Sequence, residues 1–320
     1  MRAVLTGIAL AVSVGTCVGQ TAYPQRQVTL VIPTTVGTAA DITARNFAPK
    51  LAQKFGRPFV VDNRTGASGN IAVSNVVKAP PDGYTILVTA STLAVSPFLS
   101  KGVDWDPVKD LQPVAILSAI TYVLLVHPSQ PIHSVKELVA AAKQNPGKLN
   151  YSSPGTGTPH HLIMEMFKLA TGTNITHIPY KGTAPAMTDV MNGQVDYMVE
   201  TVAATVGHVR SGRLKALGVS TLKPAAAMPD VPTLAQAAGL PDYDAAAWIG
   251  YAAPAGTPRE VLVRLSAEIQ KALQSGDLKD RMVNIGLDPV SSTPDEMAAF
   301  MRREQERYAA IIKAANIRLE

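Results

Sequence analysis

Short apolar runs alternate along the chain with longer segments whose apolar residues recur at helical spacing. Val28–Ile32 is the first apolar run; Pro33 ends it, and the pattern predicts a strand. The spacing that follows predicts a helix over Ala39–Phe55, which Pro49 is expected to kink and Gly56 to end. A strand, a loop and a helix therefore open this part of the chain.

The same alternation continues beyond the first helix. Pro58–Val61 and Thr85–Thr89 are predicted strands, and the segment Asn70–Lys78 between them is a predicted helix. Strands separated by helices favour an α/β fold with a largely parallel sheet. Further strands are predicted at Val114–Ile116, Val123–Val126 and Leu149–Ser152.

Four helix starts carry a residue that suits the N-cap position. A Ser or Thr there accepts a hydrogen bond from a helix N–H group, and a proline directly after it suits the first turn. The four residues are Ser134, Thr158, Thr257 and Thr293, and a glutamate stands three residues after the first, third and fourth. The two C-terminal helices are expected to pack on a lobe formed by the N-terminal half.

Neither an internal repeat nor a Gly/Ser-rich linker divides the chain. With 320 residues, of which 47% are apolar, the chain is long enough for one large domain or two medium ones. Two lobes require the chain to cross between them more than once, and the extended stretches near Ala119–Val123 and Pro241–Ala253 are the expected crossings. A double crossing of this kind forms a hinge.

The N-terminal segment is typical of a secretory signal peptide. It is small and aliphatic, and no charged residue occurs over Ala3–Gln25. The alternative of a membrane anchor is disfavoured, because the most apolar part, Val4–Val14, falls well short of the roughly 20 residues that cross a bilayer. Residues 1–22 are therefore predicted as a signal peptide and the mature protein as periplasmic, with cleavage after Gly19 or Ala22 left open.

The single cysteine, Cys17, lies in this segment, so the mature protein is expected to have neither a disulfide nor thiol chemistry. Lipidation of Cys17 is the minor alternative, because Val14, Gly15 and Thr16 before it form a poor lipidation site. The formal net charge of +5 is spread along the chain without a block of Lys and Arg interleaved with aromatic residues. Nucleic acid is therefore not an expected partner. The protein is also expected to be a monomer and to have no cofactor.

Two small-residue loops stand between a predicted strand and a predicted helix. The first is Pro33–Asp41 and the second Ser152–Thr158. Unpaired N–H groups and the helix dipole favour an anion at such a place, although a turn of this kind is more often only a turn. The candidate ligand-binding residues are Thr34, Thr35, Gly37, Thr38 and Asp41 in the first loop, and Ser153, Gly155, Thr156, Gly157 and Thr158 in the second, with His160 just after it.

Two charged residues near these loops have alternative roles. Asp41 either caps the first helix, which is the more ordinary role, or accepts a hydrogen bond from a ligand. Lys181 either pairs with a ligand carboxylate or is simply solvated.

Features that would indicate an enzyme are weak. Adjacent histidines on a helix point about 100° apart, so His160 and His161 do not readily serve one metal, and no metal site is expected. One of the two is expected to cap or line the loop and the other to face solvent. No Gly-x-Ser-x-Gly elbow occurs, which disfavours a serine hydrolase.

Ordered motifs along nearly all of the mature chain resemble one known family. They are Tyr23-Pro24, Asp62-Asn63-Arg64, Gly69-Asn70, Pro81-Asp82-Gly83-Tyr84, Asp106-Pro107, His177-Ile178-Pro179-Tyr180-Lys181-Gly182, Gly193-Gln194-Val195-Asp196, Asp230-Val231-Pro232-Thr233 and Ala253-Pro254-Ala255-Gly256-Thr257-Pro258. The chain resembles the substrate-binding proteins of tripartite tricarboxylate transporters, the Bordetella uptake gene (Bug) proteins.

The resemblance implies a type II periplasmic binding protein fold, with two α/β lobes, a hinge and a ligand cleft between the lobes. It implies lobe 1 over residues 23–121 and 240–320, and lobe 2 over residues 122–239. It also implies that the two loops hold one carboxylate, partly through ordered water. The distal end of the ligand would meet residues around Ser91-Thr92, Lys181 and Glu200-Thr201.

The first loop departs from the family pattern at two positions. Thr34 stands where the family has an aromatic residue and Thr38 where it has a second glycine, while Pro33, Gly37 and Asp41 remain. Loss of the ring removes an apolar wall and adds a hydroxyl, so a roomier or more polar pocket is expected. Dicarboxylates, tricarboxylates, acidic amino acids and aromatic acids all stay open as ligands.

The expected function is capture of a small organic carboxylate and its delivery to membrane permease subunits of a tripartite transporter. Closure of two lobes supplies selectivity, because only a ligand that contacts both lobes stabilises the closed state. A periplasmic sensing module that signals to a membrane sensor kinase is the alternative. A hydrolase would need a nucleophile and a base within hydrogen-bond reach, and the sequence offers no such pair.

Overall fold

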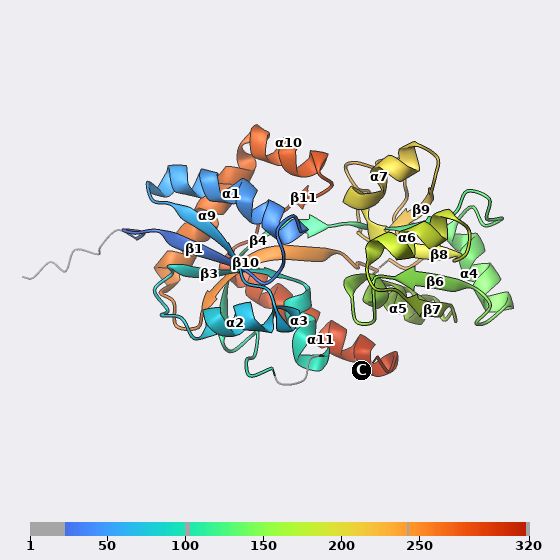
Figure 1. Ribbon diagram of the computed structural model, residues 1–320, viewed down its shortest axis with the longest axis horizontal. Coiled ribbons are helices and arrows are strands. Elements are labelled where there is room, and N and C mark those ends of the chain that lie inside the picture. Colours follow the sequence, from blue (N-terminus) through green and yellow to red (C-terminus); the bar gives the residue numbers. More distant parts are fainter. Residues whose placement is uncertain (1–22, 100–102, 242, 318–320) are drawn as a thin grey trace, which may run out of the picture.

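The computed structural model describes residues 23–99, 103–241 and 243–317. The predicted signal peptide, with Cys17, lies outside the described residues. Two α/β lobes, each built on its own sheet, lie side by side along the long axis of the molecule (Figure 1). In these described ranges no helix combines the length and the apolar character that crossing a membrane requires.

Lobe 1 has a six-stranded sheet in the order β11-β4-β10-β3-β1-β2. Its strands are β1 (Val28–Ile32), β2 (Phe59–Asn63), β3 (Thr85–Ala90), β4 (Leu111–Ile120), β10 (Ala247–Pro254) and β11 (Asp288–Pro289). Its helices are α1 (Ala39–Phe55), α2 (Asn70–Val77), α3 (Thr92–Leu99), α9 (Arg259–Gln274), α10 (Gly276–Asn284) and α11 (Pro294–Ala314), with a short 3-10 turn at Ala67–Gly69.

Lobe 2 has a five-stranded sheet in the order β7-β6-β8-β5-β9. Its strands are β5 (Tyr122–Val126), β6 (Asn150–Ser153), β7 (Thr176–Pro179), β8 (Tyr197–Thr201) and β9 (Lys215–Val219). Its helices are α4 (Val135–Gln144), α5 (Pro159–Thr171), α6 (Thr183–Met191), α7 (Val202–Arg210) and α8 (Leu234–Ala238).

The alternation of side chains along β1 explains why helices cover both faces of the lobe 1 sheet. Leu30 and Ile32 are buried in one cluster with Phe47 of α1, whereas Val31 is buried in a second cluster with Val76 of α2. Successive side chains of a strand point to opposite faces. A strand with apolar side chains on both faces therefore needs cover on both sides of its sheet.

The sheets are mixed, so the prediction of a largely parallel sheet is wrong in this respect. In lobe 1, β10 lies antiparallel between β3 and β4, and in lobe 2, β5 lies antiparallel between β8 and β9. Both are the strands with which the chain enters a lobe after crossing from the other one. A strand that enters a lobe at the end facing the other lobe runs antiparallel to the strands that end there. The spacing of hydrophobic residues could not predict this, because it does not depend on the direction of a strand.

Helix α1 has the predicted bounds, and Gly56 ends it with a left-handed φ of 66°. Ser134, Thr158 and Thr293 cap their helices as predicted. Thr257 does not, because the N-cap of α9 is Pro258. The Thr257 hydroxyl instead donates to the Pro254 carbonyl at 2.8 Å and closes the turn before the helix.

Two chain crossings join the lobes. Thr121 alone separates β4 from β5, and it is bonded to both lobes. Its carbonyl accepts the Val202 N–H of lobe 2 at 3.0 Å, and its hydroxyl donates to Asp288 of lobe 1 at 2.5 Å. The second crossing lies between α8 and β10, where Ala245 donates its N–H to the Ser220 carbonyl of lobe 2.

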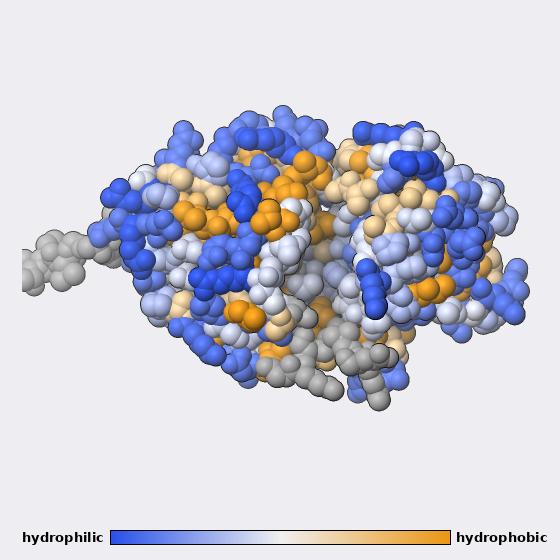
Figure 2. All heavy atoms as spheres, in the orientation of Figure 1, coloured by the Kyte–Doolittle hydropathy of each residue, from blue (hydrophilic) through white to orange (hydrophobic). Residues whose placement is uncertain are grey.

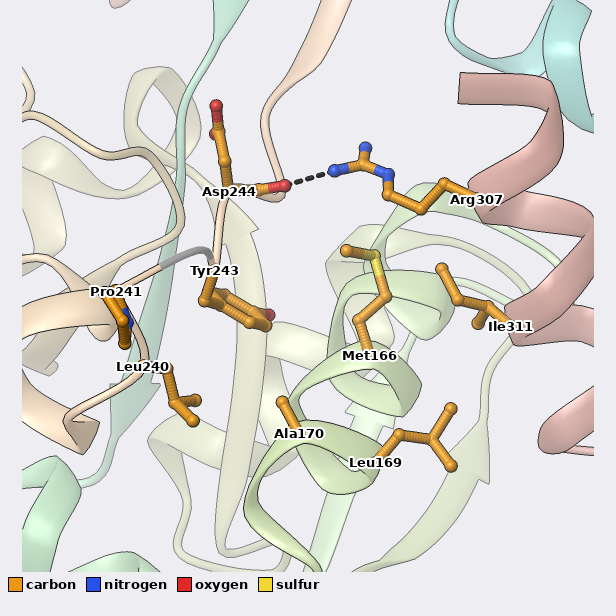
Figure 3. A pocket seen from close by; sticks show the side chains of 9 residues that line it. All are labelled: Met166, Leu169, Ala170, Leu240, Pro241, Tyr243, Asp244, Arg307 and Ile311. Atoms are coloured by element: carbon orange, nitrogen blue, oxygen red, sulfur yellow. Dashed lines mark hydrogen bonds between the residues drawn. The ribbon is translucent and has the colours of Figure 1, made fainter. Parts of the chain in front are cut away.

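Helix α11 packs on lobe 1 and reaches lobe 2 with its C-terminal half. Tyr308 and Ile311 of α11 share a buried cluster with Leu162 of α5. Arg307 donates a hydrogen bond to the Asp244 carbonyl in the second crossing (Figure 3). These contacts border a groove of about 480 Å³ whose other lining residues are Met166, Leu169, Ala170, Leu240, Pro241 and Tyr243.

A second contact between the lobes requires a glycine. Gly286, between α10 and β11, has a φ of 75°, and a Cβ atom placed on it would lie 2.5 Å from the Cα of Ala203 in α7. Figure 1 shows α10 and α7 on the same side of the molecule, one in each lobe. The absent side chain therefore allows the α10–β11 turn to touch the first turn of α7.

We expect Gly286→Ala to destabilise the protein more than Gly212→Ala. Gly212 has a similar φ of 71° but open space around its Cβ position, so both variants carry the same backbone strain. Only Gly286→Ala adds a clash with Ala203, which is expected to lower the free energy of unfolding by a further amount of about 1–3 kcal/mol. Urea unfolding of both variants measures the difference, and equal losses would contradict the contact.

Candidate ligand-binding site

The carboxyl ends of the parallel strands in the two lobes face each other. In lobe 1, β1, β3 and β4 run in one direction, and β4 ends directly before the crossing at Thr121. In lobe 2, β5 begins directly after this crossing and runs against β8, which is parallel to β6. The loops after β1, β3, β6 and β8 therefore meet between the lobes, where Figure 2 shows the molecule hollowed. Open α/β sheets bind ligands at this end of their strands.

All candidate ligand residues predicted from the sequence lie at these strand ends or at the neighbouring end of β7, which is parallel to β6. In lobe 1, β1 is followed by Thr34, Thr35, Gly37 and Thr38, the first turn of α1 contains Asp41, and β3 is followed by Ser91 and Thr92. In lobe 2, β6 ends at Ser153 and is followed by Gly155, Thr156, Gly157 and Thr158, and the first turn of α5 contains His160. Lys181 follows β7, and Thr201 ends β8.

The lobe 1 loop is shaped by hydrogen bonds within the seven residues Thr35–Asp41. Gly37 has a φ of 87°, and its N–H donates to Oδ2 of Asp41 at 3.0 Å. Thr38 is the N-cap of α1, and its hydroxyl accepts the Asp41 N–H at 3.4 Å. The same hydroxyl donates to the Thr35 carbonyl at 3.0 Å. The helix start and the loop are thus held as one unit.

Asp41 supports this loop from behind. Its side chain is 2% exposed, and besides Gly37 it accepts hydrogen bonds from Arg45 and Asn63. Burial opposes its ionised form, but the hydrogen bonds from Arg45, the Gly37 N–H and Asn63 outweigh burial and hold the pKa of Asp41 below its usual value. The expectation that Asp41 caps the helix is wrong, because Thr38 caps it.

The lobe 2 loop repeats this arrangement. Gly157 has a φ of 77°, and its N–H donates to Nδ1 of His161 at 3.0 Å. Thr158 is the N-cap of α5, and its hydroxyl accepts the His161 N–H at 3.5 Å and donates to the Gly155 carbonyl at 2.7 Å. Ser153 adds a hydrogen bond to His177, with 2.6 Å between Oγ and Nε2.

The two loops therefore share one pattern, Gly-Thr-x-x-acceptor, at Gly37–Asp41 and Gly157–His161. The glycine N–H donates to the side chain four residues later, and the threonine joins the carbonyl three residues before it to the N–H three residues after it. Sequence analysis found no internal repeat, and it missed His161 as the counterpart of Asp41. The five-residue spacing is the signal that would have found it.

Several N–H groups beside these bonds stay unpaired. Within the ranges that the structure describes, Ala39 and Ala40 of α1 and Thr156 and His160 of the second loop have no hydrogen-bond partner for their N–H groups. The first N–H groups of a helix carry the positive end of its dipole. Each lobe thus presents donors that suit one anionic group.

The two positions that depart from the family pattern are bonded to each other. The Thr34 and Thr38 hydroxyl oxygens lie 2.7 Å apart. Because Thr38 donates its proton to the Thr35 carbonyl, Thr34 is the donor in this pair. The Thr34 oxygen then keeps only acceptor capacity, so this hydroxyl is not ready to donate to a carboxylate.

The remaining candidates differ in exposure and in bonding. Ser91 is buried, and its N–H donates to the Trp248 carbonyl at 3.1 Å. Thr92 is exposed at the start of α3, and Lys181 is exposed after β7. Thr201 is the N-cap of α7 and accepts the Ala204 N–H at 3.3 Å.

His160 and the buried Glu200 form a pair beside the loops. His160 Nε2 lies 3.1 Å from Glu200 Oε1, and the two side chains are 14% and 3% exposed. Burial raises the pKa of Glu200, but the hydrogen bond and charge of His160 outweigh it and leave this pKa below its usual value. The expectation that one of His160 and His161 faces solvent is wrong, since His161 is buried and His160 is only partly exposed and pairs with Glu200.

A stack of three rings lies under the lobe 2 loop. The rings of His161 and His177 are 4.0 Å apart and 9° from parallel, and His177 stacks on Tyr151 at 4.8 Å. Burial lowers the pKa of His161, and burial with the neighbouring His161 and Lys168 charges lowers the pKa of His177 to about 3. Both imidazoles are therefore neutral at neutral pH.

Two α/β lobes, two crossings and a facing pair of anion-suited loops define a two-lobe solute-binding protein. The family described as tripartite tricarboxylate transporter family receptor matches residues 43–317, and the chain belongs to this family. BugT of Bordetella pertussis is 34% identical over 316 residues, which cover 98% of this chain and 95% of that protein. The family confirms the prediction of a Bug-type receptor for a tripartite transporter rather than an enzyme.

Solved structures agree with the two-lobe fold. Rpa4515 of R. palustris with adipate is 35% identical, with a TM-score of 0.77, and the match covers 92% of this chain and 99% of that chain. MatC of Rhodopseudomonas palustris with bound malate is 30% identical, with a TM-score of 0.72, and the match covers 91% and 100%. The predicted α/β fold with two lobes is confirmed.

We expect stability to fall as the pH falls from about 6.5 toward 3, because His177 titrates near 6.5 when unfolded and near 3 when folded. Between pH 6.5 and pH 3, His177 binds a proton in the unfolded chain but not in the folded chain. At pH 5 this is expected to cost roughly 2 kcal/mol. Urea unfolding at pH 7.5 and pH 5 should show a smaller loss for His177→Gln than for the wild type.

The matched control for this measurement is His133→Gln. His133 is exposed, and its variant controls for the exchange of a histidine for a glutamine as such. An identical loss of stability in His177→Gln and the wild type would show that His177 is not the titrating group.

Proposed function

We propose that the protein captures a small organic carboxylate between its two lobes, with one carboxylate group between the loops at Gly37–Asp41 and Gly157–His161. The observation that carries this proposal is the repeated loop at the facing strand ends of both lobes. Each loop offers unpaired N–H groups at a helix N-terminus. A ligand that joins the two sets of donors would stabilise the closed arrangement of the lobes.

The charges around the loops support an anionic ligand. Arg45 offsets the charge of Asp41, and Glu200 Oε1 is already engaged by His160 and by the Thr201 N–H. Lys181 is exposed and has no ion pair among the described residues. We propose that the distal end of the ligand contacts Lys181, Ser91, Thr92 and Thr201. We propose that Asp41 holds the lobe 1 loop in shape and does not contact the ligand.

Relatives support the chemical class. Rpa4515 was solved with adipate and MatC with malate, both of which are aliphatic dicarboxylates. Thr34, whose hydroxyl donates to Thr38, places a polar side chain where the resemblance implies an aromatic one. We propose an aliphatic dicarboxylate, or a hydroxylated one that donates to Thr34, in preference to an aromatic acid.

We further propose that the lobes move about the two crossings. The proposed division assigns residues 23–121 and 240–317 to lobe 1 and residues 122–239 to lobe 2. Delivery to the membrane permease of a tripartite transporter from the periplasm follows from membership of the family and from the predicted export of the chain. The family description supports this partner.

A thermal-shift screen of the mature protein tests the ligand class. The panel holds aliphatic dicarboxylates, hydroxydicarboxylates, tricarboxylates, acidic amino acids and aromatic acids. A ligand present at 100 times its dissociation constant is expected to add about 2.7 kcal/mol of stability. A rise confined to dicarboxylates supports the proposal, whereas no rise with any acid would overturn it.

We expect Gly157→Val to weaken binding of the best acid at least about tenfold, since a side chain at this φ distorts the loop and displaces its donors. Gly193→Val is the matched control, because Gly193 has a φ of 70° and open space around its Cβ position, in the turn after α6. Calorimetric titration of both variants compares their affinities. Equal affinities would remove the second loop from the site.

A further inference from the structure

We propose that His161 is a positioning residue, which holds the lobe 2 loop in its binding conformation by accepting the Gly157 N–H as Asp41 accepts the Gly37 N–H in lobe 1. The inference rests on the proposed function, because it assigns the loop to the ligand. It concerns a residue that is buried beneath the loop and does not contact the ligand.

The surroundings of His161 determine which ring nitrogen carries the proton. Nδ1 accepts the Gly157 N–H at 3.0 Å, so Nδ1 is unprotonated. Nε2 lies 3.8 Å from Oε1 of Glu165, too far for a hydrogen bond but near enough for the carboxylate to favour a proton on Nε2. Glu165 is itself held by Tyr151 and Lys168, at 2.7 Å and 2.6 Å.

Both ends of the loop are held from the same stack of rings. His161 binds the end of the loop at Gly157, and His177 binds its beginning at Ser153. The two imidazoles stack at 4.0 Å with their planes 9° apart. A shift of either ring would therefore move one end of the loop relative to the other.

The neutral acceptor has a consequence for an anionic ligand. In lobe 1 the acceptor is a carboxylate, and Arg45 offsets its charge within the same contact. In lobe 2 the nearby carboxylate belongs to Glu165. It lies beyond the His161 ring from the loop and forms an ion pair with Lys168. His161 thus shapes the loop without adding a negative charge beside it. A loop ordered before binding spares the ligand the cost of ordering it.

Two variants of His161 distinguish its role as a hydrogen-bond acceptor from its role in the ring stack. His161→Phe keeps a planar ring on His177 but cannot accept the Gly157 N–H. His161→Asn gives up the stack but places Oδ1 as many bonds from the backbone as Nδ1, so it can accept. We expect calorimetric titration with the best acid of the screen to show about tenfold weaker binding for His161→Phe, and most of the wild-type affinity for His161→Asn.

Amide hydrogen exchange of the ligand-free protein supplies a readout that does not depend on the ligand. We expect the Gly157 amide to exchange faster in His161→Phe than in the wild type and to stay protected in His161→Asn. Unchanged affinity in His161→Phe, equal weakening in both variants, or unchanged Gly157 exchange in His161→Phe would overturn the inference. Failure of the wild type to bind any acid would instead overturn the proposed function, and Gly157 exchange would still decide whether His161 holds the loop.

Discussion

The structure around the cleft depends on one constraint, which is that a loop cannot use the same N–H groups both to order itself and to bind an anion. In each lobe the shape comes instead from side chains placed behind the loop. One glycine N–H is accepted by the residue four positions on, and one threonine hydroxyl ties the loop to the helix start. The neighbouring N–H groups at the helix N-terminus are then left for a ligand.

The same constraint explains how charge is distributed near the cleft. Three buried carboxylates lie there, and each has a cation or an imidazole against it: Asp41 with Arg45, Glu165 with Lys168, and Glu200 with His160. A buried charge without a partner would be costly, and an unpaired carboxylate here would also repel an acid. Of the groups proposed to meet the ligand, the helix N-termini and Lys181 contribute positive charge.

Much of this could be predicted from the sequence, because strands, helix caps and small-residue loops are local patterns. Helix α1 and the caps at Thr158 and Thr293 follow from neighbouring residues. Strand direction could not be predicted, since β5 and β10 reverse only because of where the chain enters each lobe. The acceptor role of His161 could have been inferred only from the five-residue spacing that it shares with Gly37–Asp41, because a buried histidine on an apolar helix face does not by itself indicate such a role.

The bonds that shape each loop all lie inside one lobe, and this has a consequence for closure. Asp41, Arg45 and Asn63 belong to lobe 1, whereas the stack under the second loop belongs to lobe 2. Thr121, by contrast, is bonded to both lobes at the crossing. The rotation proposed about the crossings would therefore change the distance between the loops and leave the form of each unchanged. At the proposed site, selection of the ligand would then depend on the span between two rigid sets of donors, and not on how well one flexible loop can adapt.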